Sequence, residues 1–228
     1  MYKHIKIIFI SYLILYLSLT FANEGDFWFN KGLKASNVRE KIKCFTKAIE
    51  YNSNDAEAYN NRGNVKRKIK DYTGAIKDLT IAIGINPEDP VYFFNRANAF
   101  KDTNTEKNLI LAISDYSQAI KLNPNFYQAY NNRGTIKILL NQFEDSILDF
   151  TKTISIHPPH ANAYNNRGFA LFNLKKYKDA IKDFTKTIQM NPQHVNAYVN
   201  RANAKDKLGD KAGAKQDFEK AKVLGWIF

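Results

Sequence analysis

The chain has 228 residues, and its 34 Lys and Arg residues outnumber its 22 Asp and Glu residues, which gives a formal net charge of +12. A basic balance of this size is compatible with anionic partners such as nucleic acid, lipid head groups or acidic proteins. The single cysteine, Cys44, excludes an internal disulfide, so the chain relies on packing alone for its stability.

The first 22 residues have the pattern of an export signal. Lys3 and Lys6 give a basic start, residues 7–21 form an apolar run without a charge, and small residues stand at −3 and −1 of a cleavage point after Ala22. Because this run is shorter than the roughly 20 residues that a spanning helix needs, we expect residues 1–22 to be a cleaved signal peptide and the protein to be periplasmic or secreted. An uncleaved membrane anchor over residues 7–21 is the alternative.

The tripeptide Asn-Arg-Gly, or Asn-Arg-Ala, recurs at a nearly constant spacing of 34 residues. Its copies begin at Asn61, Asn95, Asn132, Asn166 and Asn200, and a looser copy begins at Asn30. Self-similarity of this period indicates stacked supersecondary units, none of which buries its apolar face alone. Six such units fill nearly all of the chain after residue 22, which leaves no room for a separate catalytic domain.

Each unit has the pattern of two amphipathic helices. In residues 161–194, apolar side chains recur at helical spacing on both sides of a polar break at Lys175 and Lys176. Most units close on a turn with proline, which biases the residue before it away from helix. We therefore expect an all-α protein with repeats over residues 25–55, 56–89, 90–126, 127–160, 161–194 and 195–228.

Large and small side chains occupy fixed positions within the units. If the glycine of the tripeptide is counted as position 8, position 4 is aromatic in all six units and position 20 is alanine in most of them. This pattern resembles the tetratricopeptide repeat, and the resemblance implies a right-handed superhelical α-solenoid of about six helix-turn-helix repeats. The third unit departs from the pattern by three extra residues around residues 104–107, and the first by Lys41 at position 20 and Ser53 in place of proline.

The sixth unit has features of the end of an array. Positions 21 and 28, which face the next repeat, are isoleucine in five units but Lys215 and Lys222 in the sixth. A terminal helix without a neighbour needs such a solvated face. The tail that follows is apolar at Leu224, Trp226, Ile227 and Phe228. It either folds back over the end of the core or offers an exposed contact to a partner or a second copy.

In the family that the chain resembles, the first helices of successive repeats line a concave groove, with positions 2, 5, 6, 9, 12 and 13 facing inward. Carried over to this sequence, those positions are rich in asparagine, and the expected groove residues are Asn61, Asn64, Asn95, Asn98, Asn131, Asn132, Asn165, Asn166, Asn200 and Asn203. An asparagine side chain both donates and accepts, so it can bond the C=O and N–H of a peptide unit. A file of them can hold an extended peptide without reading its sequence. The alternative is that these amides join neighbouring helices.

Phe169 and Phe172 make the middle of the second half of this groove apolar. Because one or two aromatic anchors usually carry most of the binding energy of a peptide, we expect these two side chains to contact the partner. Packing between repeats is the alternative. The first half of the groove is mildly basic through Arg67, Lys68 and Lys101.

Position 7 is arginine and position 23 is aspartate in the same five units, and both change together in the first unit, to Lys31 and Cys44. This pattern predicts an ion pair between the two helices of a repeat, because the guanidinium fork matches a carboxylate. Anion binding by the arginines is the alternative.

The sequence contains no phosphate-binding glycine loop, no zinc-protease motif and no nucleophile elbow, so we predict neither catalytic activity nor a cofactor. His157 and His160 could begin a metal site, but no cysteine or carboxylate cluster completes it, and no metal is predicted. The basic side chains that clamp acidic chaperone tails in related proteins are absent from positions 5 and 6. Most lysines lie outside the groove, which is typical of a solvated face, so nucleic acid is not an expected partner.

The leading hypothesis is a scaffold that binds an extended segment of a partner protein in its groove. The alternative is a structural subunit of an envelope assembly that docks through the ends of the array, where Phe27, Trp28 and Phe29 lie at one end and residues 226–228 at the other. Self-association through the termini belongs to this second hypothesis. Membrane association follows if the signal is retained.

Overall fold

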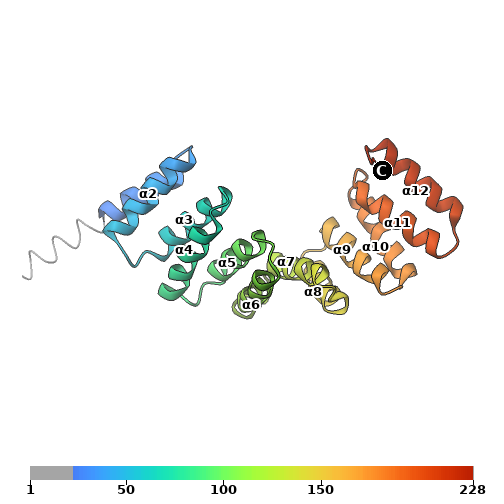
Figure 1. The fold of residues 1–228 in the computed structure, drawn as a ribbon, viewed down its shortest axis with the longest axis horizontal. Helices are drawn as coiled ribbons and strands as arrows, with labels where there is room; N and C mark the ends of the chain where they lie inside the picture. Colours follow the sequence, from blue (N-terminus) through green and yellow to red (C-terminus); the bar gives the residue numbers. More distant parts are fainter. Residues whose placement is uncertain (1–22, 228) are drawn as a thin grey trace, which may run out of the picture. The chain divides into compact units, whose positions relative to one another are not determined.

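A computed structural model describes residues 23–227 of the chain (Figure 1). The expected signal peptide, residues 1–22, and Phe228 of the tail lie outside the described residues, so export stays a prediction. Every regular element in residues 23–227 is helical, as the all-α expectation required. A helix over residues 23–34 is followed by α2 (Val38–Tyr51), α3 (Ala56–Lys68), α4 (Tyr72–Ile85), α5 (Pro90–Asp102), α6 (Glu106–Leu122), α7 (Tyr127–Leu139), α8 (Phe143–Ile156), α9 (Ala161–Asn173), α10 (Tyr177–Met190), α11 (Val195–Lys207) and α12 (Lys211–Val223).

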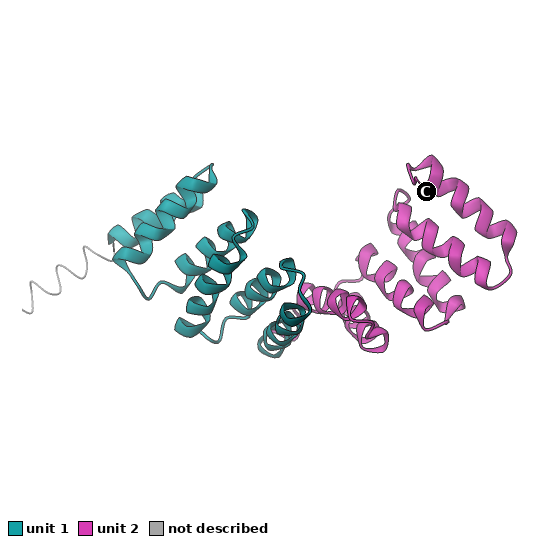
Figure 2. Ribbon diagram, in the orientation of Figure 1, with its two compact units in different colours: residues 1–122 teal, residues 123–228 magenta. Residues whose placement is uncertain are grey.

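The chain divides into two compact units, one ending at Leu122 and the other beginning at Asn123 (Figure 2). In the first unit, residues 23–34 pack against α2, and α3–α4 and α5–α6 form two further hairpins. In the second unit the hairpins are α7–α8, α9–α10 and α11–α12. The second helix of one hairpin also packs against the first helix of the next, for example α10 against α11. Each unit is therefore a stack of helical hairpins.

A left-handed residue at position 15 connects the two helices of each hairpin from the second onward. These residues are Lys70, Asn104, Asn141, Lys175 and Gly209, with φ between 52° and 84°. Glycine takes this conformation without a steric cost and asparagine tolerates it, so at Lys70 and Lys175 the packing of both helices keeps it. The three extra residues of the third unit, expected between its helices, instead lengthen its second helix: α6 has 17 residues where α4, α8 and α10 have 14.

Small residues let the two helices of a hairpin approach closely, as the pattern at positions 8 and 20 indicated. A Cβ atom added to Gly168 on α9 would lie 2.7 Å from Cε1 of Phe184 on α10. Phe184 is fully buried, and so are Ala180 and Ala204, which pack against it. One large side chain per repeat packs against these small residues, for example Leu79 in the second repeat and Phe150 in the fourth.

The end of the last repeat is solvated. Lys215 and Lys222 are exposed, in agreement with the sequence. Trp226 folds back and stacks on Phe218, with ring centroids 5.6 Å apart and planes 15° from parallel. Ile227, in contrast, is 88% exposed. The expectation that the tail folds back over the core is therefore confirmed for Trp226. Ile227 is exposed, and a contact between it and a partner stays a prediction.

Candidate functional site

Two adjoining hollows lie along α9 in the second unit. The larger, which we call the groove hollow, has a volume of about 290 Å³ and is lined by Thr135, Ile138, Leu139, Asn165, Asn166, Phe169, Asn196 and Asn200. All of these residues occupy positions that the sequence placed on the inner face. The smaller, the aromatic hollow, has a volume of about 80 Å³ and is lined by Phe169, Phe172, Phe184, Asn200 and Asn203. Because Phe169 and Asn200 belong to both, the two hollows form one continuous surface across α9 and α11.

The amides at positions 5 and 6 join successive first helices. Asn200 on α11 donates through Nδ2 to Oδ1 of Asn165 on α9, at 3.2 Å. The same bond in the first unit runs from Asn95 to Asn60, at 2.8 Å. The structure thus shows the helix-joining role for Asn95 and Asn200. Each of these side chains keeps an acceptor and a second N–H, because the bond uses only one of its donors.

This amide link is not made between α7 and α9. Within the described residues, Asn166 accepts from Asn165 at 3.3 Å, and its own Nδ2 makes no hydrogen bond. Oδ1 of Asn131, which would be its counterpart on α7, is buried and has no hydrogen-bond partner within residues 23–227. Asn131 donates instead to its neighbour Asn132, at 3.4 Å. An unused donor therefore lies at the edge of the groove hollow.

Three further asparagines of the first unit are engaged within their own helix or repeat. Asn61 donates to the carbonyl oxygen of Glu57 on the same helix, at 3.0 Å, and Asn64 donates to Asn60 at 3.4 Å. Asn98 departs from the expected inward file, because it is only 6% exposed and accepts a hydrogen bond from the Tyr116 hydroxyl at 2.6 Å. The tyrosine on α6 holds this amide inside the repeat, so we exclude Asn98 from the candidate surface.

The two expected aromatic anchors differ in their surroundings. Phe169 is 37% exposed and borders both hollows. Phe172 is partly buried, with its ring 5.3 Å from that of Tyr177, and it packs on the cluster around Phe184. Phe172 thus packs on Tyr177 and Phe184 of its own repeat, in a cluster that also holds Ala204 of the next, and it lines the aromatic hollow, whereas Phe169 is the more accessible ring.

The basic residues expected in the first half of the groove are partly neutralised. Arg67 on α3 pairs with Asp102 on α5, with Nη1 and Oδ2 2.7 Å apart. Lys101 lies 4.0 Å from the same carboxylate. The first unit thus presents a charged, cross-linked inner face, whereas no charged side chain lines either hollow of the second unit.

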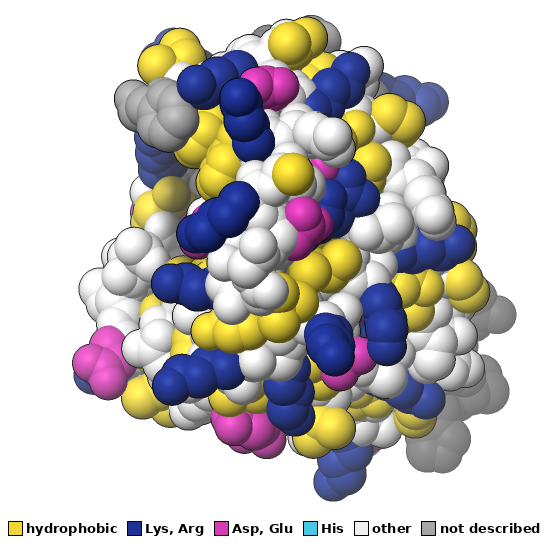
Figure 3. Space-filling model, turned by 90° about the vertical axis from the view of Figure 1, so that its right-hand side faces the viewer, with side chains coloured by type: hydrophobic (Ala, Val, Ile, Leu, Met, Phe, Trp, Pro, Cys, Tyr) yellow, Lys and Arg dark blue, Asp and Glu magenta, His cyan; other side chains and the backbone are white. Residues whose placement is uncertain are grey.

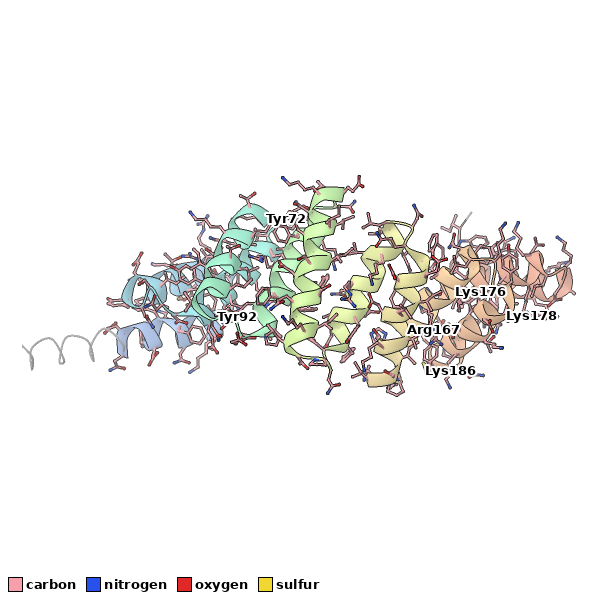
Figure 4. All side chains as sticks on the ribbon, turned by 90° about the horizontal axis from the view of Figure 1, so that it is seen from below. Tyr72, Tyr92, Arg167, Lys176, Lys178 and Lys186 are labelled. Carbon is pink, nitrogen blue, oxygen red and sulfur yellow. The ribbon has the colours of Figure 1, made fainter. Side chains whose placement is uncertain are left out.

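The predicted ion pair between positions 7 and 23 is confirmed in five repeats. Each arginine donates through Nε and Nη2 to the two oxygens of its aspartate, at 2.6–3.0 Å, in Arg62–Asp78, Arg96–Asp115, Arg133–Asp149, Arg167–Asp183 and Arg201–Asp217. Arg167, on α9 in Figure 4, also donates to Thr151 of the preceding repeat, at 3.2 Å. Arg62, Arg96, Arg167 and Arg201 therefore hold both their own hairpin and the junction with the repeat before it.

Sequence reasoning missed a second cation at three of these aspartates. Position 11 is lysine in three repeats, and its Nζ lies 2.8–2.9 Å from the aspartate in Lys66–Asp78, Lys137–Asp149 and Lys205–Asp217. Burial opposes ionisation of Asp217, but the hydrogen bonds from Arg201 and Lys205 outweigh it and lower the pKa of this carboxyl. The recurrence of lysine at position 11 in three repeats is the sequence feature that could have predicted this second cation.

Two histidines in the turn between α8 and α9 contact the ring of Tyr127 on α7. His157 stacks on Tyr127 with centroids 4.6 Å apart, and His160 lies 5.9 Å from the same ring. Nδ1 of His160 accepts the N–H of Ala163 at 3.1 Å and so caps α9. Burial, followed by the nearby His157, holds the pKa of His160 below its ordinary value. Because α9 carries the groove residues, this cap helps to position them.

We expect His160→Asn to reduce the loss of stability on acidification. Because the pKa of His160 is lower in the folded state than in the unfolded chain, the unfolded chain binds a proton first as the pH falls below about 6.5, and stability falls. Asparagine keeps the cap but does not titrate. Urea unfolding at pH 7.5 and pH 5.5 measures the difference. A wild-type and variant pair with the same pH dependence would contradict this role.

The remaining lysines are dispersed. Lys176, Lys178 and Lys186 project from α10 and the turn before it (Figure 4). On the face seen in Figure 3, Lys and Arg side chains are scattered among hydrophobic ones instead of forming a continuous track. Within residues 23–227, no helix has the length and apolarity needed to cross a membrane, and no group of three His, Cys, Asp or Glu side chains could hold a metal ion.

Curated relatives share part of their sequence with this chain. It is 36% identical over 92 residues to small glutamine-rich tetratricopeptide repeat-containing protein 2 of Mycosarcoma maydis, a match that covers 40% of this chain and 25% of that protein. It is 29% identical over 133 residues to a UDP-N-acetylglucosamine–peptide N-acetylglucosaminyltransferase of Giardia intestinalis, a match that covers 58% of this chain and 9% of the enzyme. The chain therefore spans a quarter or less of the length of these relatives.

Solved structures show the same fold. YrrB, described as a tetratricopeptide repeat protein with an unusual peptide-binding site, superposes with a TM-score of 0.71 at 18% identity, covering 81% of this chain and 93% of YrrB. MamA superposes with a TM-score of 0.69 at 21% identity, covering 74% and 91%. Family profiles of the tetratricopeptide repeat match residues 44–77, 115–147, 161–194 and 195–222. Since these matches together span more than half of the sequence, the chain belongs to the tetratricopeptide repeat family.

Proposed function

We propose that the chain is a protein-interaction scaffold whose second unit holds an extended segment of a partner protein in the groove hollow and the aromatic hollow. The observation that carries this proposal is the continuous surface formed by the two hollows, with an exposed ring at Phe169 and an unused amide donor at Asn166. The description of YrrB as peptide-binding supports it by analogy of fold.

The chemistry of this surface suits a peptide backbone beside an apolar side chain. Asn166 and Asn200 offer N–H and C=O groups on successive helices, and main-chain groups of an extended segment need such partners when they leave water. Phe169, Phe172 and Phe184 converge on the aromatic hollow, which would desolvate one apolar side chain of the segment. Enzymatic activity is not part of this proposal, because the match to the transferase covers only 9% of that enzyme.

The first unit is a weaker candidate for the same task. Its amides at Asn61 and Asn98 are already bonded within the unit, and the Arg67–Asp102 pair crosses its inner face. A peptide bound there would have to compete with these contacts, whereas in the second unit Nδ2 of Asn166 makes no hydrogen bond within the described residues.

The test is a binding measurement with peptides selected from a displayed random dodecapeptide library. For such a peptide, Phe169→Ala should weaken binding by about 2 kcal/mol, or roughly 30-fold, as expected for an aromatic anchor. Asn166→Ala should weaken it by about 1 kcal/mol through loss of one hydrogen bond. Fluorescence anisotropy with a labelled peptide gives both values.

Matched controls are available on the same chain. Leu148 on α8 is 67% exposed but does not line either hollow, so Leu148→Ala should leave the affinity unchanged. Asn61→Ala repeats the position-6 substitution in the first unit and should also be silent. If Leu148→Ala and Phe169→Ala weaken binding equally, the peptide binds elsewhere and the proposal fails.

Docking through the ends is the second candidate function, and exposed apolar side chains favour it. Phe27 at the first repeat is 56% exposed, and Val223 and Ile227 at the last are 79% and 88% exposed. An assembly formed this way would lose its partner in Phe27→Lys or Ile227→Lys variants and keep it in Phe169→Ala. The groove proposal requires the opposite result.

A further inference from the structure

The first repeat has the same internal register as the others but lacks their central ion pair. A Cβ atom on Gly32 would lie 2.7 Å from Cε1 of Phe45, the same distance as between Gly168 and Phe184 in the fifth repeat. The residues just before these two, Lys31 and Cys44, therefore occupy the places of Arg167 and Asp183. A cation is kept at position 7, and a buried thiol replaces the carboxylate.

Other cations gather around this unpaired position. A hollow of about 330 Å³ is lined by Trp28, Lys31, Asn37, Arg39, Glu40, Lys43 and Cys44. Lys31 and Lys47 lie over the Trp28 ring, with Nζ 4.9 and 4.0 Å from its centroid. We call this the basic hollow.

The cations of the basic hollow have no internal counter-ion. Lys31, Arg39 and Lys43 take part in no ion pair within residues 23–227, whereas the position-7 arginine of every later repeat is paired. The one carboxylate in the lining, Glu40, accepts from Nδ2 of Asn37 at 3.3 Å. The hollow therefore keeps an excess of positive charge that the other repeats neutralise.

We propose that the basic hollow binds a phosphate-type dianion. Three cationic side chains from two helices surround one concave space, and a phosphate group carries more negative charge and more acceptor oxygens than a single carboxylate. Lysine binds phosphate as a point charge, and the arginine adds a fork of donors. A free phosphate ion and the phosphate of a lipid head group have the same chemistry at this site, and the experiment distinguishes them.

The fluorescence of Trp28 can be used to measure binding to the basic hollow. In a Trp226→Phe background it is the only tryptophan, and Nζ of both Lys31 and Lys47 lies over its ring, so its fluorescence should change when an anion draws these side chains away. Inorganic phosphate and pyrophosphate are titrated at constant ionic strength set with sodium chloride. A saturable change with either, absent with chloride, supports a soluble phosphate ligand. Sedimentation with phosphatidate vesicles but not with phosphatidylcholine vesicles supports a lipid phosphate.

The decisive variant rebuilds the ion pair of the other repeats. Lys31→Arg combined with Cys44→Asp should weaken phosphate binding about tenfold, because an internal carboxylate then takes the place of the ligand. Its melting temperature, compared with that of the parent, shows that the variant is folded. Lys31→Arg alone should bind as the parent does, since the cation is kept.

The proposal does not depend on the groove. Phe169→Ala should bind phosphate as the parent does, so failure of peptide binding and failure of phosphate binding are separate results. The idea is overturned if the double variant binds as tightly as the parent, or if neither the phosphate ions nor the phosphatidate vesicles bind.

Discussion

Replacing Arg167 by alanine is expected to lower the free energy of unfolding by about 3–5 kcal/mol, because it leaves the buried Asp183 carboxylate without a cation. The fifth repeat has Leu171 at position 11, so no lysine substitutes for the arginine. The hydrogen bond to Asp183 also raises the pKa of Arg167, which shows how closely the two charges are coupled. Urea unfolding followed by circular dichroism measures the loss.

Arg201→Ala is the matched control. It removes the same two hydrogen bonds to Asp217 and the same contact to a threonine of the preceding repeat, Thr185 at 3.1 Å. Lys205 stays 2.9 Å from Asp217, however, and keeps that carboxylate compensated. We therefore expect a clearly smaller loss than for Arg167→Ala. The first unit repeats the comparison with Arg96, which has no lysine beside its aspartate, and Arg62, which has Lys66.

Equal losses in the two members of each pair would contradict the ion-pair interpretation. The peptide proposal adds a second condition. Arg167 lines neither hollow, so Arg167→Ala should leave peptide affinity unchanged at temperatures where the variant is folded. A variant that kept its stability but lost its ligand would instead favour anion binding by these arginines.

The architecture could be predicted because the same sequence pattern recurs in each repeat. Six copies of one pattern predict two helices per unit. Arginine and aspartate occur together in five units and are both replaced in the first, by Lys31 and Cys44. This joint change predicts a contact between the two positions that their spacing alone would not. Repetition within one chain acts here as an alignment of its own units. The parts common to all repeats were therefore predictable.

The features that differ between repeats could not be predicted from the sequence. Asn98 has the same repeat position as Asn64 and Asn203, but only its repeat places a tyrosine, Tyr116, where the hydroxyl reaches the amide. The hydrogen bond between Asn166 and Asn131 is missing although the same two residue types are joined at Asn200 and Asn165, so residue type alone does not predict its absence. Lys175 adopts φ of 60° because the two helices that it joins are held by packing, not because of its own preference.

We expect Phe184→Ala to lower the free energy of unfolding by about 3–5 kcal/mol, the range for a phenylalanine removed from a well-packed core. Phe184 is fully buried between Gly168 of its own repeat and Ala204 of the next. Phe218 is the same residue at the same position of the last repeat. It is only partly buried, and Trp226 replaces a following helix as its cover. Phe218→Ala should therefore cost less, about 2 kcal/mol.

The difference between these two losses measures what a following repeat contributes. In a stacked array, stability is approximately a sum of terms within repeats and terms between neighbours. Both substitutions remove the ring from its own hairpin, but only Phe184→Ala also removes contacts with the next first helix, at Ala204. Urea unfolding of the two variants gives the comparison, and equal losses would mean that Trp226 covers the last repeat as well as a helix does. A larger loss for Phe184→Ala would show that the contact between Phe184 and Ala204 couples the fifth and sixth repeats. Because Phe184 also lines the aromatic hollow, the same contact shapes the surface proposed for the partner.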